Sequence, residues 1–240
     1  MALNTTKMVL VGKTGAGKST IANILVQGDL FKVNRLNVSN QAKGVTTSVE
    51  VVDGRDWTVV DTVGLGELQG LGAKGTDEAT RLLIRVLKEG QMGFHHIAFV
   101  IEKGRVTTDE YKRLFELFKS TFAGAENNFL LIVTKCYEQQ WITDNKAILN
   151  QTFGDLPVVY CDFPSGGRRP EQDKEDRLKS LESFEKQLAR LNRRQVVPKL
   201  STPEEASEET KEEFAEKLGS FLGVSLKVIL NFVRKLLSSL

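Results

Sequence analysis

Short apolar runs alternate with stretches of helical periodicity along most of this chain. Residues 7–12 (KMVLVG) form an apolar run that ends in glycine, which predicts a buried strand. Residues 18–27 (KSTIANILVQ) carry apolar side chains at helical spacing and predict a helix directly after that strand. The same patterns predict strands at 95–102, 127–135 and 156–163, and helices at 77–89, 107–122, 141–153 and 175–194.

Residues 47–62 depart from this alternation. Two β-rich runs flank Asp53 and Gly54, a dipeptide that favours a tight turn, so the segment predicts an antiparallel hairpin. Elsewhere the alternation of strands and helices implies a mostly parallel sheet with helices on both faces, to which the hairpin adds one antiparallel edge. The predicted fold class is therefore α/β, and a ligand is expected at the carboxyl ends of the strands.

The composition changes near Val196. Residues 196–218 are acidic and contain two prolines, which predicts a linker that leads into a short helix. Residues 219–240 are mostly apolar, with polar positions every three or four residues that form one stripe of a helix. We therefore expect one domain over 1–195 and, over 196–240, an acidic linker with an amphipathic C-terminal helix.

Composition and charge narrow the class of protein. The 240 residues are 40% hydrophobic and 27% charged, as in ordinary globular proteins, and the net charge of +2 gives no indication of a nucleic-acid partner. Cys136 and Cys161 lack metal-ligand spacing and are expected to be reduced, part-buried thiols of a cytoplasmic protein. The first residues contain no apolar stretch long enough for a signal peptide or a membrane span.

A glycine-rich segment follows the first predicted strand. Gly12, Gly17, Lys18 and Ser19 match the pattern G-x-x-x-x-G-K-S between a strand and a helix, which is the phosphate-binding loop, or P-loop. Glycines let backbone N–H groups converge on phosphate oxygens, and the positive end of the helix dipole adds to their attraction. Lys18 is expected to stabilise charge on the phosphates during catalysis. The predicted phosphate-binding residues are Lys13, Thr14, Gly15, Ala16, Gly17, Lys18, Ser19 and Thr20.

Three positions are predicted to bind Mg²⁺. The Ser19 hydroxyl is one, and Asp61, at the end of a predicted strand, is another. The third is a threonine of the loop before the hairpin, where Thr46 is favoured over Thr47. Gly64 follows Asp61 in the pattern D-x-x-G, so its backbone N–H is expected to reach the γ-phosphate.

With these motifs in order, the chain resembles GTPases of the AIG1/GIMAP type, which are immunity-associated nucleotide-binding proteins related to septins and chloroplast-import receptors. The similar stretches are GKTGAGKST, GVTTS, DTVGL and above all EKGRVTTDEYKRLFELF, at residues 102–118. The resemblance covers residues 7–194. It implies a P-loop fold, bound GTP or GDP with Mg²⁺, and dimerisation across the nucleotide face.

The resemblance also places the base-binding positions. Relatives end a strand with Asn/Thr-Lys-x-Asp, and here Thr134 and Lys135 are followed by Tyr137 where the aspartate would be. Either Glu138 takes that role after a local shift, or Tyr137 stacks on the base. Phe163 belongs to the polar loop expected over the base. Because the aspartate is missing, the preference for GTP over ATP is open.

Catalysis is expected to be slow. Leu65 stands where related enzymes place a water-orienting glutamine. Arg105 is the candidate for an arginine finger supplied by a second copy, or it only pairs near the start of its helix. The predicted function is a switch or assembly GTPase stimulated by dimerisation. The alternative is a nucleotide-dependent scaffold that binds GTP or ATP with little hydrolysis.

The apolar C-terminal segment has two interpretations. In the first, residues 220–240 lie on a membrane surface, with Lys227, Arg234 and Lys235 near the edge of the apolar face. In the second, the segment folds back on the nucleotide domain or pairs with another copy, because an exposed apolar helix of this size is not tolerated in a soluble monomer.

Overall fold

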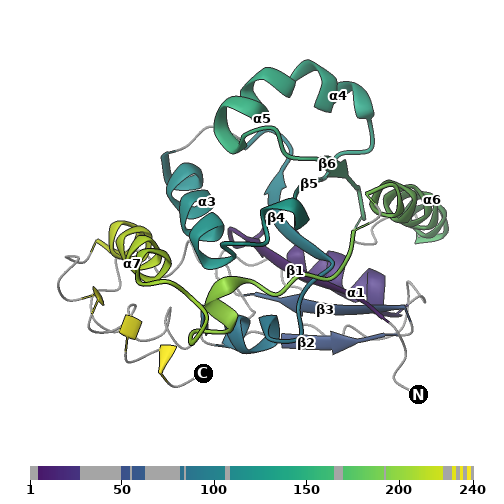
Figure 1. Ribbon diagram of the computed structural model, residues 1–240. Helices are drawn as coiled ribbons and strands as arrows, with labels where there is room; N and C mark the ends of the chain where they lie inside the picture. The colour runs from purple at the N-terminus through teal and green to yellow at the C-terminus, as the bar shows by residue number, and fades with distance from the viewer. Residues whose placement is uncertain are drawn as a thin grey trace.

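A six-stranded sheet forms the centre of the computed structural model (Figure 1). The strands are β1 (Thr6–Gly12), β2 (Glu50–Asp53), β3 (Trp57–Asp61), β4 (His96–Glu102), β5 (Phe129–Thr134) and β6 (Val158–Tyr160), in the order β2-β3-β1-β4-β5-β6. Only β2 runs antiparallel to its neighbour. The predicted α/β class, the parallel sheet and the edge hairpin are confirmed. The structure describes residues 5–27, 50–54, 56–62, 82–83, 85–105, 109–164, 170–191, 193–223, 229–230, 233–234 and 237–238.

The helices follow the predicted alternation with one difference. Their bounds are α1 (Lys18–Gln27), α3 (Asp109–Thr121), α4 (Gln139–Asp144), α5 (Lys146–Phe153), α6 (Pro170–Ala189) and α7 (Glu208–Leu222). The single helix predicted at 141–153 is instead the pair α4 and α5. At the break, the backbone N–H of Asn145 donates to the Trp141 carbonyl over 3.1 Å, and its side-chain amide donates to the same carbonyl over 2.8 Å.

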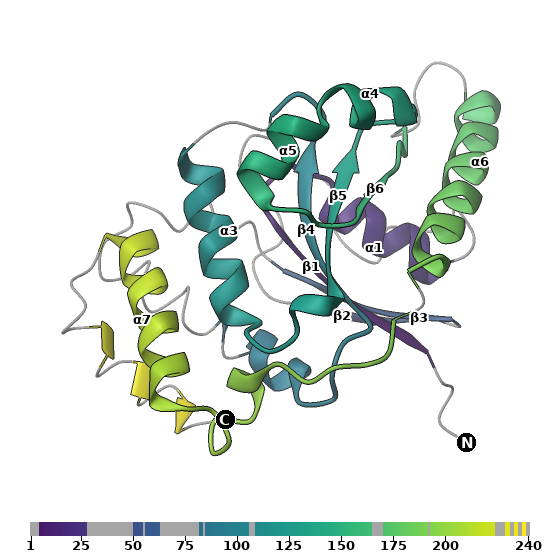
Figure 2. The ribbon, with the colours of Figure 1, turned by 45° about the horizontal axis from the view of Figure 1, so that its top comes forward.

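Both faces of the sheet are covered, as Figure 2 shows. Successive residues of a strand point to opposite faces, so Val9 and Val11 of β1 pack in one core cluster and Met8 and Leu10 in the other. The first cluster contains side chains of α3, α5 and α7, and the second contains side chains of α1 and α6. The apolar runs are therefore continuous because the central strands are buried on both sides.

Residues 196–207 pack closely against the sheet and the helices around it. Val196 pairs with Phe94 in a bridge, Leu200 is fully buried, and the Lys199 backbone N–H donates to the Ala123 carbonyl over 2.9 Å. The acidic composition of this segment predicts a linker. Its few apolar positions nevertheless pack into the core together with α7. The segment therefore contributes to the same core as the sheet, and the boundary at 195 stays a prediction.

Helix α7 forms an outer layer against α3 (Figure 2). Ser207 caps its start by accepting from the Thr210 backbone N–H over 3.2 Å, and Gly223 ends it at φ 70°. Phe214, Leu218 and Phe221 enter the core cluster of α3.

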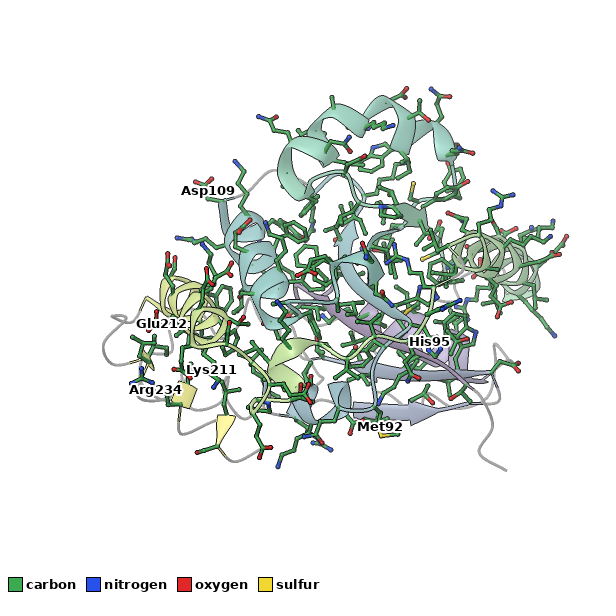
Figure 3. All side chains as sticks on the ribbon, viewed as in Figure 1. Met92, His95, Asp109, Lys211, Glu212 and Arg234 are labelled. Atoms are coloured by element: carbon green, nitrogen blue, oxygen red, sulfur yellow. The ribbon has the colours of Figure 1, made fainter. Side chains whose placement is uncertain are left out.

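The described residues of the C-terminal tail turn their apolar side chains inward. Ile229, Val233 and Leu237 are buried in the core cluster of α3 and α7. Arg234 is exposed and lies 3.9 Å from the Glu208 carboxylate at the start of α7, next to Lys211 (Figure 3). Of the two interpretations of the tail, the structure shows the fold-back for these residues, and membrane contact stays a prediction. Within the described part of the chain, no helix has the length and apolarity needed to span a membrane.

The amino end of the sheet holds a buried histidine. His96 is 5% exposed at the start of β4, and its ring centre lies 6.0 Å from that of Trp57. Burial lowers the pKa of His96 to about 4, and the neighbouring charges of Arg193 and His95 add to this effect. His95 and Met92 mark the same end of the molecule in Figure 3, opposite the carboxyl ends of the parallel strands.

Candidate functional site

The loop between β1 and α1 has a backbone that only glycine permits at several positions. Gly15 and Gly17 have φ of +77° and +91°, in the left-handed region. A Cβ atom on Gly12 would collide with the Val100 carbonyl oxygen of β4, and one on Gly17 would lie 3.2 Å from Thr134 Cγ2. The loop therefore stays close to the neighbouring strands while its N–H groups remain free of side chains.

Lys18 is buried at the centre of this loop. It opens α1, is 6% exposed, and its ammonium group donates to the carbonyl oxygens of Gly12 over 3.1 Å and Lys13 over 2.9 Å. These contacts wrap the loop around the ammonium group and hold it at the positive end of the α1 dipole. Two sources of positive charge therefore meet where the phosphates are expected.

The two predicted metal ligands described by the structure lie in contact. Register between β1 and β3 pairs Leu10 with Asp61, which places Asp61 beside the loop, and the Ser19 hydroxyl donates to Asp61 Oδ2 over 2.6 Å. Asp61 is fully buried. A hydroxyl and a carboxylate are ligands that Mg²⁺ prefers, so this donor set fits a magnesium ion. Thr14 Oγ1 is also buried here and has no hydrogen-bond partner among the described residues.

The remaining predicted phosphate residues lie around the same loop. Ala16 is buried, Gly15 is exposed, and Thr20 is half-buried in the first turn of α1. The Lys13 ammonium group lies 4.2 Å from the ring centre of Tyr111 in α3. Thr46, Thr47, Gly64 and Leu65 lie outside the described residues, so their predicted roles stay predictions.

Thr134 connects the loop to the other half of the sheet. Its hydroxyl group is buried and lies within hydrogen-bond distance of two carbonyl oxygens, that of Ala16 at 2.8 Å and that of Ile101 at 3.1 Å. Its side chain therefore supports the phosphate loop from β5. The following residue, Lys135, has φ of 54°, a conformation that non-glycine residues rarely adopt and that is found most often at functional sites.

Glu102 holds two predicted site residues and was missed by sequence reasoning. One oxygen lies 2.6 Å from Lys135 Nζ, and the other lies 3.3 Å from Arg105 Nε. Arg105 remains 70% exposed despite this ion pair. The carboxylate thus joins Lys135, a predicted base-binding residue, to the candidate arginine finger. Its position at the carboxyl end of β4 was the available signal in the sequence.

The predicted base-binding side chains are spread over several environments. Tyr137 is 68% exposed, with the Lys103 ammonium group 5.4 Å from its ring centre. Glu138 is exposed and precedes α4. The Phe163 ring lies edge to face against Phe184 of α6, with the ring centres 6.1 Å apart. The structure therefore groups these residues at the ends of β5 and β6, where Tyr137 and Glu138 are exposed and Phe163 packs against α6.

A cavity of about 490 Å³ lies at the ends of β5 and β6. Cys136 and Tyr137 line one side, Asp162 and Pro164 another, and residues of α6 the third. Asp162 is the second residue that the sequence analysis did not single out, although it directly precedes Phe163 of the loop that the resemblance places over the base.

The geometry and the fold together define a P-loop protein of the α/β class. A model described as the AIG1 family matches residues 6–150, more than half of the chain. The chain therefore belongs to the AIG1 family.

Curated relatives from Arabidopsis thaliana are longer chains. Immune-associated nucleotide-binding protein 10 is 35% identical over 109 residues, which are 43% of this chain and 22% of that protein. Immune-associated nucleotide-binding protein 7 is 25% identical over 126 residues, which are 52% of this chain and 39% of that protein. The chain thus spans well under half the length of these relatives.

A solved structure shares the fold. It is a dimerization-deficient arginine-to-alanine mutant of Toc33 from Arabidopsis thaliana, with a TM-score of 0.52 and 19% identity over 82% of this chain and 88% of that chain. At this identity the similarity shows the fold alone.

Proposed function

We propose that this protein binds GTP and GDP with Mg²⁺ and hydrolyses GTP slowly. The observation that carries the proposal is the contact of Ser19 with Asp61 beside the buried Lys18. A hydroxyl, a carboxylate and an ammonium group at one end of a helix form the set that a magnesium nucleotide requires. Membership of the AIG1 family supports the guanine nucleotide.

Each residue of the phosphate loop and its surroundings has a separate role in the proposed reaction. Lys18 exchanges its bonds to the carbonyl oxygens of Gly12 and Lys13 for bonds to phosphate oxygens, where its charge stabilises the transition state. Ser19 and Asp61 would hold the metal ion, which would supply charge neutralisation at the phosphates. With Leu65 in place of a water-orienting glutamine, the isolated chain turns over slowly.

Arg105 is the proposed source of stimulation in a dimer. It is 70% exposed at the carboxyl end of the sheet, and its ion pair with Glu102 holds it on the nucleotide face. An arginine supplied in trans raises such rates by about 10³–10⁵. The Toc33 structure, named for an arginine-to-alanine change that impairs dimerisation, supports an arginine at such an interface.

Two measurements test the proposal. Chromatography of the nucleotide released from the purified full chain should show GDP or GTP, and Lys18→Ala with Ser19→Ala should abolish its binding. Phosphate release per molecule should rise with protein concentration, and Arg105→Ala should remove that rise, whereas Arg113→Ala on α3 should not. Tight binding without phosphate release at any concentration would favour the scaffold, and equal affinity for ATP and GTP would refute the guanine assignment.

A further inference from the structure

The carboxylate of Asp162 is a group at the site that the phosphate chemistry does not use. Asp162 follows β6, and the parallel register pairs Val133 with Tyr160 near the ends of the two strands. The Cys136 backbone N–H donates to the Cys161 carbonyl over 3.1 Å and holds the two strand ends together. Helices α4 and α6 flank this end of the sheet (Figure 2).

Asp162 lines the cavity of about 490 Å³. Its backbone N–H donates to the Ser180 hydroxyl of α6 over 3.0 Å, which fixes the main chain. In the part of the chain that the structure describes, its carboxylate makes no hydrogen bond or ion pair. Asp176, which lines the same cavity, accepts from the Gln172 side chain over 3.0 Å.

Charge and burial at Asp162 act against each other. Burial raises the pKa of its carboxyl group, while the ammonium groups of Lys103 and Lys135 lower it and the Asp176 carboxylate adds to the rise. Partial burial displaces some of the water around this carboxylate, and a ligand that offers N–H donors restores the hydrogen bonds that burial displaces. The cavity therefore suits a ligand edge with adjacent donors.

We infer that Asp162 reads the base of the nucleotide by accepting hydrogen bonds from the N1–H and the 2-amino group of guanine. This inference rests on the proposed function and specifies its base. The two guanine donors lie side by side and match the two oxygens of one carboxylate. Adenine presents an unprotonated ring nitrogen on the same edge, which repels a carboxylate, so Asp162 favours guanine.

The other candidates at this end of the sheet fit the role less well. Tyr137 has no carboxylate, and its ring lies beside Lys103 at 68% exposure. Glu138 is exposed and is not part of the cavity lining, so water satisfies its carboxylate and a base gains less by binding it. Asp162 thus replaces the aspartate that the strand-end motif lacks, from the neighbouring strand.

The test compares nucleoside diphosphates on the full chain with Mg²⁺, by competition against a fluorescent GDP. GDP should bind about 10-fold or more tightly than IDP, which lacks the 2-amino group, and far more tightly than ADP. Asp162→Asn should weaken GDP binding about 10- to 100-fold, bring the GDP to IDP ratio close to one, and improve binding of XDP. XDP carries an oxygen in place of the 2-amino group, and the new amide can donate to it.

Matched variants separate the possible outcomes. Asp176→Asn changes a second carboxylate of the same cavity, and Glu138→Gln removes the rival, so both should keep the parent ratio of GDP to IDP. Ser180→Ala, which loosens the Asp162 backbone, should lower that ratio by a smaller factor and serves if Asp162→Asn does not fold. An unchanged ratio in Asp162→Asn, or a parent that binds GDP and IDP equally, overturns the inference. A parent that binds no magnesium nucleotide instead refutes the proposed function.

Discussion

The phosphate end and the base end of this site are built differently. At the phosphate end, Lys18 and Asp61 are almost completely buried and already bonded to the loop and to Ser19. At the base end, Lys135 and Tyr137 are 62% and 68% exposed. The first end is a short contiguous loop whose backbone makes the site, while the second is assembled from side chains on separate strands. In the proposed site, the groups that bind phosphate are therefore largely in place before the ligand arrives. The choice of base depends instead on how the ends of separate strands come together.

Removing the phosphate lysine should have the largest effect. Lys18→Ala should weaken binding of magnesium GDP by about 100-fold or more, because a buried ammonium group bonds charged oxygens. Lys135→Ala, at the exposed base end, should cost only about 10-fold or less. Isothermal titration measures the GDP affinity of both variants. Equal losses of affinity would show that the two ends of the site do not differ in this way.

The buried His96, at the opposite end of the sheet, should make the free energy of unfolding depend on pH. Because the pKa of His96 is about 4 in the folded chain and 6.5 in its ordinary state, the unfolded chain binds the extra proton. The free energy of unfolding should therefore fall by roughly 3 kcal/mol as the pH drops from 6.5 to 4.

Urea denaturation at several pH values measures this decrease in the free energy of unfolding. In His96→Phe most of the decrease should disappear. A parent whose stability does not change over that interval would contradict the assignment. The two ends of the site are best compared above pH 6.5, where this contribution is constant.

The backbone of the loop can be tested at two of its glycines. Gly12→Ala places a methyl group against the Val100 carbonyl oxygen and should lower the free energy of unfolding by about 1–3 kcal/mol. Gly15→Ala meets no atom within 4 Å but keeps the positive φ of +77°, so it should cost about 1 kcal/mol. Thermal denaturation of the two variants separates collision from conformational strain, and an equal cost would show that the close approach of β4 is unimportant.

The smallest expected effect concerns the link between the two cations. Glu102→Gln removes the ion pairs to Lys135 and Arg105 and should change GDP affinity by about 5-fold or less, because both cations are mostly exposed. Glu116→Gln, which breaks the surface pair with Lys119, is the control and should leave affinity unchanged. Competition binding at low salt gives the comparison, and a loss as large as that of Lys18→Ala would show that the base end is also preformed.

The sequence by itself determined the phosphate end of this protein. Gly12, Gly17, Lys18 and Ser19 are nearly contiguous, and their backbone chemistry is local, so a pattern of residue types is enough to predict the loop and the strand and helix around it. Asp61 could also be predicted, because it ends a predicted strand and begins the pattern D-x-x-G in a chain that has a phosphate loop.

Only the tertiary structure decided the base end and the C-terminal segment. Glu102 meets Lys135 across neighbouring strands, and the pairing of β5 with β6 brings Asp162 into one cavity with Cys136 and Tyr137. Ile229 and Val233 are buried because α3 and α7 together offer an apolar surface that no local pattern reveals. These contacts join residues far apart in the sequence, so they depend on how the strands are ordered and on which faces the helices cover.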